Sequence, residues 1–360
     1  MAKKVMVAMS GGVDSSVTAA LLKEEGYDVV GVTIKLWPAY IDAVEDTGGC
    51  CSLAAVEDAR RVAQILDIPF YVLNMQKEFQ KTVIDKFSQE YMLGRTPNPC
   101  IECNRSIKFG RLLEKAAQLG MDYVATGHYA RIVQEGGVFH LLRGRDRDKD
   151  QSYALYSLSH GMLARILFPL GGFRKEEIRA LAGQHQLPIA NKPDSQEICF
   201  IPDNNYKEFL TTYAGASNTP GNIIDTQGRV LGTHTGIFNY TIGQRKGLGL
   251  ASGQPLYVVD INPQTNTVTV GGNKDVYSRE FTVSDFTWIG GAPPASQFSA
   301  AVAIRYNAPA QPANVLVESP GVLVRFTEPQ RAITPGQSAV IYSGDEVLGG
   351  GIILSQWQDL

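Results

Sequence analysis

Apolar runs alternate with amphipathic stretches along the first half of the chain. The run Val5–Met9 predicts a buried strand, and residues 17–25 have the spacing of an amphipathic helix that ends at Gly26. Further strands are predicted at 27–34, 69–74 and 123–126, and helices are predicted from Ser52 and on both sides of the loop 95–100. This alternation predicts an α/β fold, a parallel sheet with helices on both faces.

The pattern changes in the second half of the chain. Residues 150–213 predict another helical section, which completes a first domain over 1–213. From Ala214 onward the apolar runs are short, turn residues recur and helical periodicity disappears. We therefore expect two small β-rich domains, a central one over 214–280 and a barrel-like one over 281–360.

Composition fits a globular protein of several domains, with 360 residues, 44% hydrophobic and 19% charged. No apolar run approaches the roughly 20 residues that span a bilayer. Because Met1–Lys4 lead directly into the first strand, there is no room for a signal peptide and we expect a cytoplasmic protein. The net charge of −3 gives no sign of nucleic acid, so an RNA-binding surface has to be a local basic patch.

The segment Ser10–Ser16, which reads SGGVDSS, joins the first strand to the first helix. A glycine turn at a helix N-terminus presents N–H groups and the positive end of the helix dipole, and the serines add donors, so the segment predicts an anion site. The chain has no Walker A loop, and the segment lacks the third glycine of a dinucleotide fingerprint. The alternative is a Ser/Gly-rich turn in which Asp14 is a first-turn helix charge.

Five cysteines in a cytosolic protein are more often reactive or metal-binding than disulfide-bonded. Cys100 and Cys103 form a C-x-x-C, which alone fits half a zinc site, a redox dithiol or an incidental spacing. The nearby Arg105 and Lys108 at a predicted helix start favour the thiolate form. Cys199 has apolar neighbours in the sequence, which is typical of a buried and unreactive core cysteine.

Several motifs taken together resemble one family. They are SGGVDS, Arg95-Thr96-Pro97-Asn98-Pro99-x-x-x-Cys103-Asn104, Ala125–Tyr129, Lys149–Tyr153, Ser195–Ile201 and Tyr240–Gly247. The first resembles the pyrophosphate loop of the ATP pyrophosphatase (PP-loop) superfamily, and the whole set resembles the tRNA-specific 2-thiouridylases of the MnmA type. The resemblance implies that the first domain is an adenine nucleotide α-hydrolase-like, ATP-binding catalytic domain and that the C-terminal barrel contacts tRNA.

The resemblance also implies a tRNA-uridine 2-sulfurtransferase. Enzymes of this family replace the 2-oxygen of the wobble uridine with sulfur, using ATP with Mg²⁺ and releasing AMP and pyrophosphate. Cys199 matches the residue that receives sulfur as a persulfide from an upstream sulfur carrier or cysteine desulfurase. Cys103 matches the nucleophile that releases this sulfur and forms a disulfide with Cys199. We expect a monomer that does not bind membranes.

Motif matching also assigns two sets of contact residues. Those expected to contact ATP are Ala8, Met9, Ser10, Gly11, Gly12, Val13, Asp14, Ser15, Ile34 and Gly127. Those expected to contact tRNA are Asn98, Pro99 and Cys100, which meet the target base, and His128, Lys149, Asp150, Gln151, Arg305, Tyr306 and Gln337. From the residue pattern alone, 149–150 also fits a solvated charge run, and 305–306 fits the edge of a barrel strand.

The chain departs from the family pattern at Cys100, where many members carry Asp, a natural acid/base group. The thiol brings three cysteines near one site, so an alternative mechanism uses an iron–sulfur cluster on Cys100, Cys103 and Cys199. Cys50 and Cys51 are interpreted as structural or as a feature of the helix entry, with no role in the chemistry. Two other functions fit part of the chain, a ligase that adenylates a small carbonyl compound and a non-enzymatic, nucleotide-gated RNA-binding protein.

Overall fold

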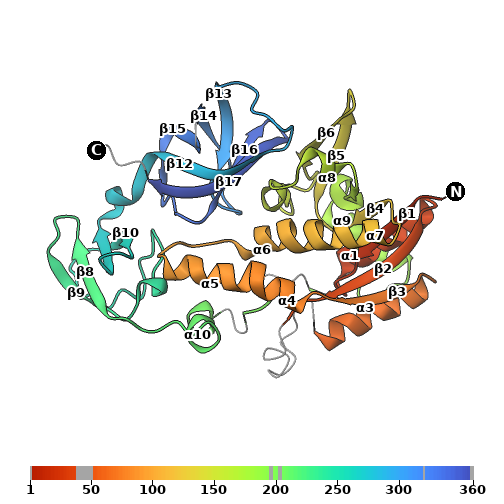
Figure 1. Cartoon of the computed structure of the whole chain (residues 1–360), viewed down its shortest axis with the longest axis horizontal. Helices are drawn as coiled ribbons and strands as arrows, with labels where there is room; N and C mark the ends of the chain where they lie inside the picture. Colours follow the sequence, from red (N-terminus) through yellow and green to blue (C-terminus); the bar gives the residue numbers. More distant parts are fainter. Residues whose placement is uncertain (1, 38–51, 194–197, 202–204, 319–320, 357–360) are drawn as a thin grey trace.

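Three sheets organise the protein (Figure 1). The computed structural model describes residues 2–37, 52–193, 198–201, 205–318 and 321–356. The first sheet lies near the N-terminus and has five strands, the second has four, and the third has eight and includes the C-terminal strands. Among the described residues, no helix combines the length and hydrophobicity needed to cross a bilayer.

The first sheet has the strand order β3-β2-β1-β4-β7, and every neighbouring pair is parallel. Its strands are β1 (Lys4–Ala8), β2 (Asp28–Lys35), β3 (Phe70–Asn74), β4 (Tyr123–Ala125) and β7 (Ile166–Leu167). Because β1 lies between β2 and β4, the carboxyl ends of these three strands meet at one edge. The chain leaves β1 there and enters α1 (Val13–Glu24).

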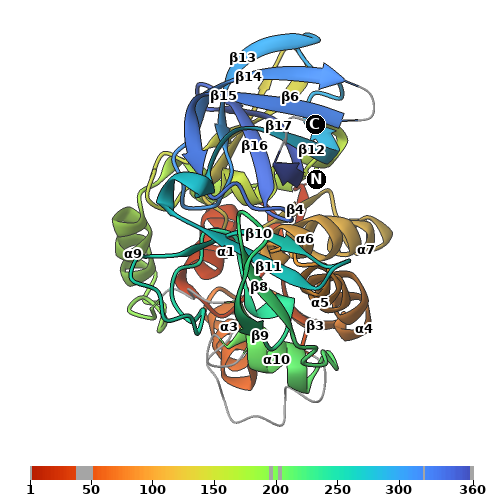
Figure 2. The ribbon, with the colours of Figure 1, turned by 90° about the vertical axis from the view of Figure 1, so that its left-hand side faces the viewer.

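Helices cover both faces of this sheet, as Figure 2 shows from the side. Val5 and Val7 point to one face, where they pack with residues of α1, α3 (Leu53–Ile65) and α9 (Lys175–Gln184). Met6 points to the other face, because side chains alternate along a strand, and belongs to a second cluster. That cluster includes residues of the helices between 76 and 118 and of α10 (Tyr206–Thr212).

The two helices that flank the loop 95–100 are built in segments. The first comprises α4 (Gln76–Phe79), η1 (Gln80–Ile84) and α5 (Asp85–Met92), and the second comprises α6 (Pro99–Glu102), η2 (Cys103–Arg111) and α7 (Leu112–Gln118). Both η1 and η2 are π-helical. Such turns are rare and often lie at functional sites. Cys103 is the first residue of η2.

Two β-rich regions follow. The four-stranded sheet, in the order β10-β11-β8-β9, contains β8 (Gly221–Asp225), β9 (Val230–His234), β10 (Tyr257–Asn262) and β11 (Thr267–Gly271). The six strands of the C-terminal region are β12 (Tyr277–Trp288), β13 (Gln297–Ala303), β14 (Gln311–Glu318), β15 (Gly321–Arg331), β16 (Ser338–Ser343) and β17 (Glu346–Gln356). β12 pairs with both β15 and β17, which closes a barrel. The predicted fold class is therefore confirmed.

Two parts of the first 213 residues differ from the prediction. The hairpin of β5 (Ala130–Glu135) and β6 (Val138–Arg143) was not predicted, and it extends the barrel sheet through the pair Leu142 and Glu346. A single helical section over 150–213 is wrong, because prolines, glycines and the short β7 divide it. It contains η3 (Ser152–Leu155), α8 (His160–Leu163) and η4 (Pro169–Gly172) before α9. The remaining short turns are η6 (Ile237–Asn239) and η7 (Asn273–Val276).

Candidate active site

The turn between β1 and α1 has the conformation of an anion site. Gly11 has a φ of 70°, and a Cβ there would lie 2.2 Å from the carbonyl oxygen of Ala55, so the position requires glycine. Ser15 Oγ accepts a hydrogen bond from the N–H of Ser10 at 3.1 Å and so ties the turn to the helix. Gly12 is the N-cap of α1 and provides no side-chain cap. The first-turn N–H groups of α1 are therefore suited to a bound anion.

The other residues predicted to contact ATP lie at the same edge of the sheet. Gly127 follows β4, and a Cβ there would lie 2.9 Å from the backbone nitrogen of Ser15. Ala8 ends β1 and pairs with Val32, two residues before Ile34. Ligands of parallel α/β sheets bind at this kind of edge. Met9 and Val13 are buried beneath the turn, at 2% and 3% exposure.

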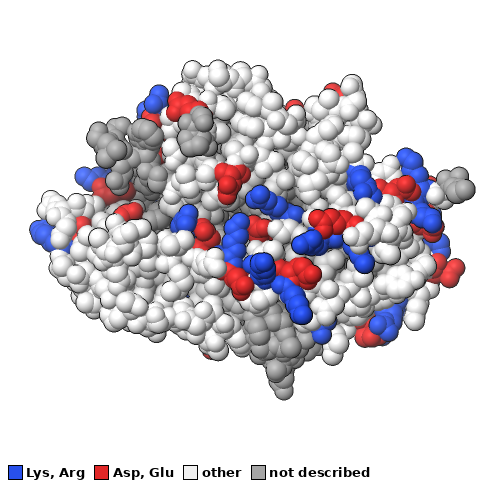
Figure 3. All heavy atoms as spheres, in the orientation of Figure 1, with Lys and Arg blue, Asp and Glu red and all other residues white. Residues whose placement is uncertain are grey.

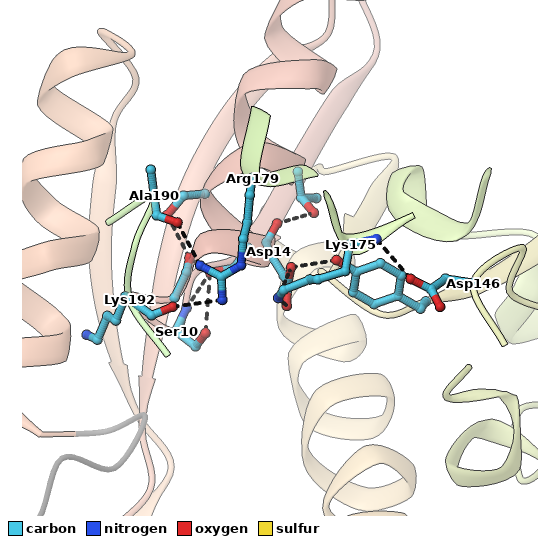
Figure 4. A network of polar contacts seen from close by, with 12 residues as sticks. Ser10, Asp14, Asp146, Lys175, Arg179, Ala190 and Lys192 are labelled. Carbon is cyan, nitrogen blue, oxygen red and sulfur yellow. Dashed lines mark hydrogen bonds and ion pairs between the residues drawn. The ribbon is translucent and has the colours of Figure 1, made fainter. Parts of the chain in front are cut away.

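Asp14, the one carboxylate of the turn, is part of a partly buried polar network (Figure 4). The Nζ atom of Lys175 lies 2.8 Å from both carboxylate oxygens of Asp14. The hydroxyl of Tyr129 donates to Asp14 Oδ1 at 2.7 Å. The Lys175 side chain is 10% exposed and the Asp14 side chain is 30% exposed, so the lysine is buried and the carboxylate is still reached by solvent.

Two further cations lie beside this network. Arg179 donates to the carbonyl oxygens of Ala190 and Lys192, at 2.8 and 3.2 Å. The Nζ atom of Lys192 donates to the carbonyl oxygen of Gly11 at 3.1 Å and to Asp58 at 2.8 Å. The segment after α9 is thereby attached to the anion-binding turn.

The sequence itself specifies where the cysteine-bearing helix begins. Asn98 is the N-cap of α6, and its side chain accepts from the N–H of Cys100 at 3.1 Å. Pro99 stands at the first helical position, where its fixed φ is favourable. Cys100 is consequently exposed at the helix start, and Cys103, three residues on, is buried.

Cys199 is held next to an aromatic anchor. The ring of Phe200 makes edge-on contacts with Phe79, Phe87 and Phe209, at centroid distances of 5.6, 5.4 and 5.3 Å. Because aromatic pairs have preferred geometries, these contacts fix the Phe200 ring and with it the backbone of the adjacent Cys199.

One hydrophobic cluster joins the cysteines to the ATP edge. Cys103 belongs to it, and Cys199 packs against it. Ile34 at the end of β2 is a member of the same cluster, and Ala8 at the end of β1 packs against it. The two predicted sulfur-handling cysteines and two predicted ATP residues thus contact the same hydrophobic cluster.

The loop before α6 is held by the C-terminal barrel. The N–H of Thr96 donates to the carbonyl of Pro335 at 2.9 Å, and Gln337 Nε2 donates to the carbonyl of Thr96 at 2.7 Å. A Cβ at Gly336, where φ is 88°, would lie 2.8 Å from the nitrogen of Thr96. In this structure Gln337 therefore positions the loop, and its contact with tRNA stays a prediction.

Asp150 and Gln151 build a turn. Asp150 Oδ1 accepts from the N–H groups of Gly144 and Ser152, at 2.9 and 3.1 Å. Gln151 Oε1 accepts from the N–H of Tyr129 at 3.0 Å. These contacts connect the predicted tRNA segment, with the half-buried Lys149, to the ATP network. Contact of Lys149, Asp150 and Gln151 with tRNA stays a prediction.

Tyr306 brings the barrel to the cysteine loop. Its ring lies 6.0 Å from that of Tyr153, edge to face. Burial raises the pKa of the Tyr306 hydroxyl, and the nearby charges of Asp150 and Cys100 raise it further. Tyr306, Asp150 and Cys100, three predicted tRNA contacts from distant segments of the chain, are therefore near one another. Arg305 is exposed and donates to a backbone carbonyl at 3.1 Å.

His128 is buried, at 8% exposure. Its ring lies 5.8 Å from both Phe109 and Phe168, and its Nδ1 lies 2.7 Å from Thr126 Oγ1. Burial, helped by the charge of Lys108, holds the pKa of His128 well below its usual value. The imidazole is therefore neutral near pH 7, and its predicted contact with tRNA stays a prediction.

The sequence suggests two metal groups at this site, Mg²⁺ with ATP and an iron–sulfur cluster. Mg²⁺ on a nucleotide commonly takes one or two carboxylates, with phosphates and waters as its other ligands, and Asp14 in the anion-binding turn fits that role. In the described part of the chain, no three His, Cys, Asp or Glu side chains are grouped so as to hold a metal ion. Cys100, Cys103 and Cys199 therefore do not fit an iron–sulfur cluster here. Cys50 and Cys51 lie outside the described residues.

Charged side chains form a band of mixed sign across the face in Figure 3. Ion pairs at the cysteine loop have the same character, with Lys86 2.8 Å from Glu102 and Arg95 3.2 Å from Glu90. The local basic patch expected for RNA binding is not a feature of this face, where Lys and Arg are interspersed with Asp and Glu.

The motif analysis assigned no role to four residues of the polar network: Tyr129, Lys175, Arg179 and Lys192. One signal was present in the sequence. Lys175 begins α9, where a cation opposes the helix dipole. A lysine at that position suggests that its charge is used outside the helix.

Three family models match successive parts of the chain. They are the tRNA methyl transferase HUP domain over residues 3–203, the tRNA methyl transferase PRC-barrel domain over 207–272 and the aminomethyltransferase beta-barrel domain over 278–353. The tRNA-specific 2-thiouridylase MnmA of Carboxydothermus hydrogenoformans is 57% identical over 359 residues, which cover 98% of this chain and 97% of that protein. The enzyme of the same name from Clostridium perfringens is 53% identical over 354 residues, which cover 98% and 99%. The chain therefore belongs to the family of the MnmA-type tRNA-specific 2-thiouridylases.

Proposed function

We propose that this protein is a tRNA-uridine 2-sulfurtransferase that forms 2-thiouridine at the wobble position of tRNA. The observation that carries the proposal is the hydrophobic cluster in which Ile34 and Cys103 are members and against which Ala8 and Cys199 pack. An ATP edge and a pair of cysteines in one cluster suit a reaction in which an activated oxygen is replaced by sulfur. Membership of the family supports tRNA as the substrate.

The first step activates the base. The C2 carbonyl oxygen of uridine attacks the α-phosphorus of ATP, an O–P bond forms, and the bond to the β-phosphate breaks. The N3 proton of the base is lost. The pyrophosphate is held by the turn that contains Gly11, Gly12 and Ser15. Mg²⁺, held by Asp14, neutralises phosphate charge when bound.

The second step exchanges oxygen for sulfur. The terminal sulfur of a Cys199 persulfide attacks C2, and AMP leaves with the former base oxygen. The Cys103 thiolate then attacks Cys199 Sγ and breaks the sulfur–sulfur bond, so the sulfur stays on C2 and the base regains its N3 proton. A Cys103–Cys199 disulfide remains, which a cellular thiol reductant reduces. Holding both cysteines in one catalytic site would lower the entropic cost of this exchange.

The cysteine loop and the barrel form the tRNA-facing part of the site in this proposal. Asn98, Pro99 and Cys100 meet the target base, with Tyr306 from the barrel beside them. His128, Gln151 and Gln337 complete the contacts around this loop. Lys149 and Arg305 contact phosphates, and Asp150 holds the turn that presents Lys149. A sulfur carrier or cysteine desulfurase supplies the persulfide.

The proposal is tested by nucleoside analysis of tRNA incubated with the protein, Mg-ATP and a persulfide donor. We expect 2-thiouridine and AMP in equal amounts, and neither product when ATP is left out or when the tRNA lacks a wobble uridine. AMP formation on a small carbonyl compound without tRNA would favour the ligase. Binding of tRNA without AMP release would favour a non-enzymatic role.

The persulfide route has its own test. The protein is purified without oxygen and analysed for iron and acid-labile sulfide. We expect full thiolation activity in protein that contains neither. A stoichiometric cluster that activity requires would replace the persulfide mechanism while leaving the overall reaction unchanged.

A further inference from the structure

We propose that Lys175 binds the β- and γ-phosphates of ATP, and that its ion pair with Asp14 is the ligand-free arrangement, which exchanges when Mg-ATP binds. The inference rests on the proposed function only in taking ATP as the nucleotide of the anion-binding turn. It adds a phosphate-binding cation that none of the motifs contains.

The position of Lys175 is the first support. Its Nζ atom lies 2.8 Å from both oxygens of Asp14, so it lies within one side-chain length of the N-terminus of α1. Figure 4 shows that it reaches the turn from α9, opposite the segment that carries Lys192. The Tyr129 ring lies 5.8 Å from Lys175 Nζ and flanks its path. The side chain of Lys175 is only 10% exposed.

The cost to its own helix is the second support. A cation at a helix N-terminus is opposed by the helix dipole. The backbone N–H of Lys175 donates to Asp146 at 2.9 Å, and Glu177 accepts from the N–H of Arg174 at 2.6 Å, so acidic groups stabilise this end of α9 separately. The Lys175 ammonium is therefore placed for the anion-binding turn and not for α9.

Its chemistry distinguishes Lys175 from the neighbouring cations. Arg179 donates to the carbonyl oxygens of Ala190 and Lys192, and Lys192 Nζ donates to Asp58 and to the carbonyl oxygen of Gly11. Those contacts build the framework of the turn. Lys175 is paired with Asp14, the carboxylate that fits Mg²⁺.

Electrostatics gives the reason for an exchange. A bare carboxylate beside the turn would repel a polyphosphate, and Lys175 neutralises Asp14 in the ligand-free protein. When Mg²⁺ takes Asp14, the ammonium gains a stronger anionic partner in the phosphates. A lysine suits this change because its ammonium is a compact charge on a flexible stem.

The first experiment measures binding of ATP, AMP and pyrophosphate, each with Mg²⁺, by calorimetry. Lys175→Met should weaken ATP and pyrophosphate about tenfold or more, because a charge-assisted contact is lost, and change AMP by less than about twofold. Lys175→Arg should recover part of the loss. Lys23→Met is the control, because Lys23 donates to the backbone carbonyl oxygen of Asp67 at the other end of α1, and it should bind all three ligands normally.

The second experiment measures pyrophosphate binding without metal. Asp14→Asn removes repulsion whether or not Lys175 touches phosphate, so the informative difference is between Asp14→Asn and the double variant with Lys175→Met. We expect the double variant to bind at least about tenfold more weakly than Asp14→Asn. This difference is measured without Mg²⁺ and without turnover.

Two results would overturn the inference. One is an equal loss of AMP and ATP affinity in Lys175→Met, which would mean that the ion pair only stabilises the fold. The other is equal pyrophosphate binding by Asp14→Asn and the double variant. Either result leaves the proposed function intact if the wild-type protein forms 2-thiouridine, whereas the absence of that product would refute the proposed function alone.

Discussion

The anion-binding turn Ser10–Ser16 and the cysteine loop Arg95–Cys103 are built in different ways. The turn is held by contacts within its own domain: Ser15 Oγ accepts from the N–H of Ser10, and Lys192 Nζ donates to the carbonyl oxygen of Gly11. The cysteine loop begins its helix locally, through Asn98, but its position depends on the barrel. Gln337, which holds it, is 241 residues away from Thr96.

This difference separates the two halves of the proposed reaction. A turn fixed by contacts within its own domain can bind ATP whether or not tRNA is present. A loop fixed by a distant domain can respond to tRNA when the RNA contacts that domain. We therefore expect changes in the turn to alter ATP binding, and changes at the loop or the barrel to alter sulfur transfer while ATP binding is kept.

The largest effect is expected at the cysteines. Cys199→Ser removes the atom that would carry the persulfide, so 2-thiouridine formation should fall by about a thousandfold or more. The affinity for ATP should stay within about twofold of wild type, since the turn is unchanged. Calorimetry and nucleoside analysis measure the two quantities. Cys51→Ser is the matched control, and thiolation at the normal rate by Cys199→Ser would contradict the mechanism.

The next effect is expected at the turn itself. In Gly11→Ala the new Cβ meets the carbonyl of Ala55, and the backbone keeps a φ of 70°. Strain of this kind costs about 1–3 kcal/mol, and the affinity for ATP should fall with it. Urea unfolding and calorimetry measure the two losses.

Gly26→Ala is a control that keeps the backbone strain of a positive φ but lacks the steric clash that the new Cβ causes in Gly11→Ala. Gly26 also has a positive φ, 84°, but a Cβ there would meet nothing within 4 Å. This variant should lose about 1 kcal/mol of stability from backbone strain and bind ATP normally. Equal ATP affinity in the two variants would show that the shape of the turn is not set by Gly11.

A smaller effect is expected where the barrel holds the loop. Gln337→Ala removes the hydrogen bond to Thr96, worth about 1 kcal/mol, so kcat for thiolation should fall by about fivefold. If Gln337 instead contacts tRNA directly, KM for tRNA should rise while kcat is kept. Gln330→Ala is a matched control on the same barrel, because Gln330 donates to the carbonyl of Glu328 on the exposed surface.

The same contrast explains what the sequence could predict. The turn was recognisable because consecutive residues between a strand and a helix create its N–H groups and its glycine requirement. The predicted helix start near Arg105 was wrong, because the adjacent cap residues Asn98 and Pro99 begin the helix earlier, at α6. The family resemblance added the cysteines and the tRNA positions, which no local pattern distinguishes from core or surface residues.

What could not be predicted depends on pairs that are far apart in the chain. Asp14 and Lys175 are 161 residues apart, and no local signal says which cation meets that carboxylate. The hairpin β5–β6 was missed for a related reason, because it pairs with β17 of the barrel and not with the sheet of its own domain. Such contacts are decided by packing of the complete chain, not by propensity.

The smallest effect is expected from His128, which lies beside Gly127 at the ATP edge. Burial holds its pKa well below the ordinary 6.5, so the folded protein stays unprotonated there at pH values where the unfolded chain already binds a proton. The free energy of unfolding should therefore fall as the pH drops below about 6.5, and it should be regained as the pH rises. His128→Gln should make urea unfolding midpoints between pH 8 and pH 5 less dependent on pH.

Protonation of His128 should also disturb the anion-binding turn, because His128 follows Gly127 directly and Gly127 packs on the backbone of Ser15. ATP affinity should therefore weaken at low pH in the wild type and less so in the variant, while identical pH profiles would show that the histidine is not coupled to the turn.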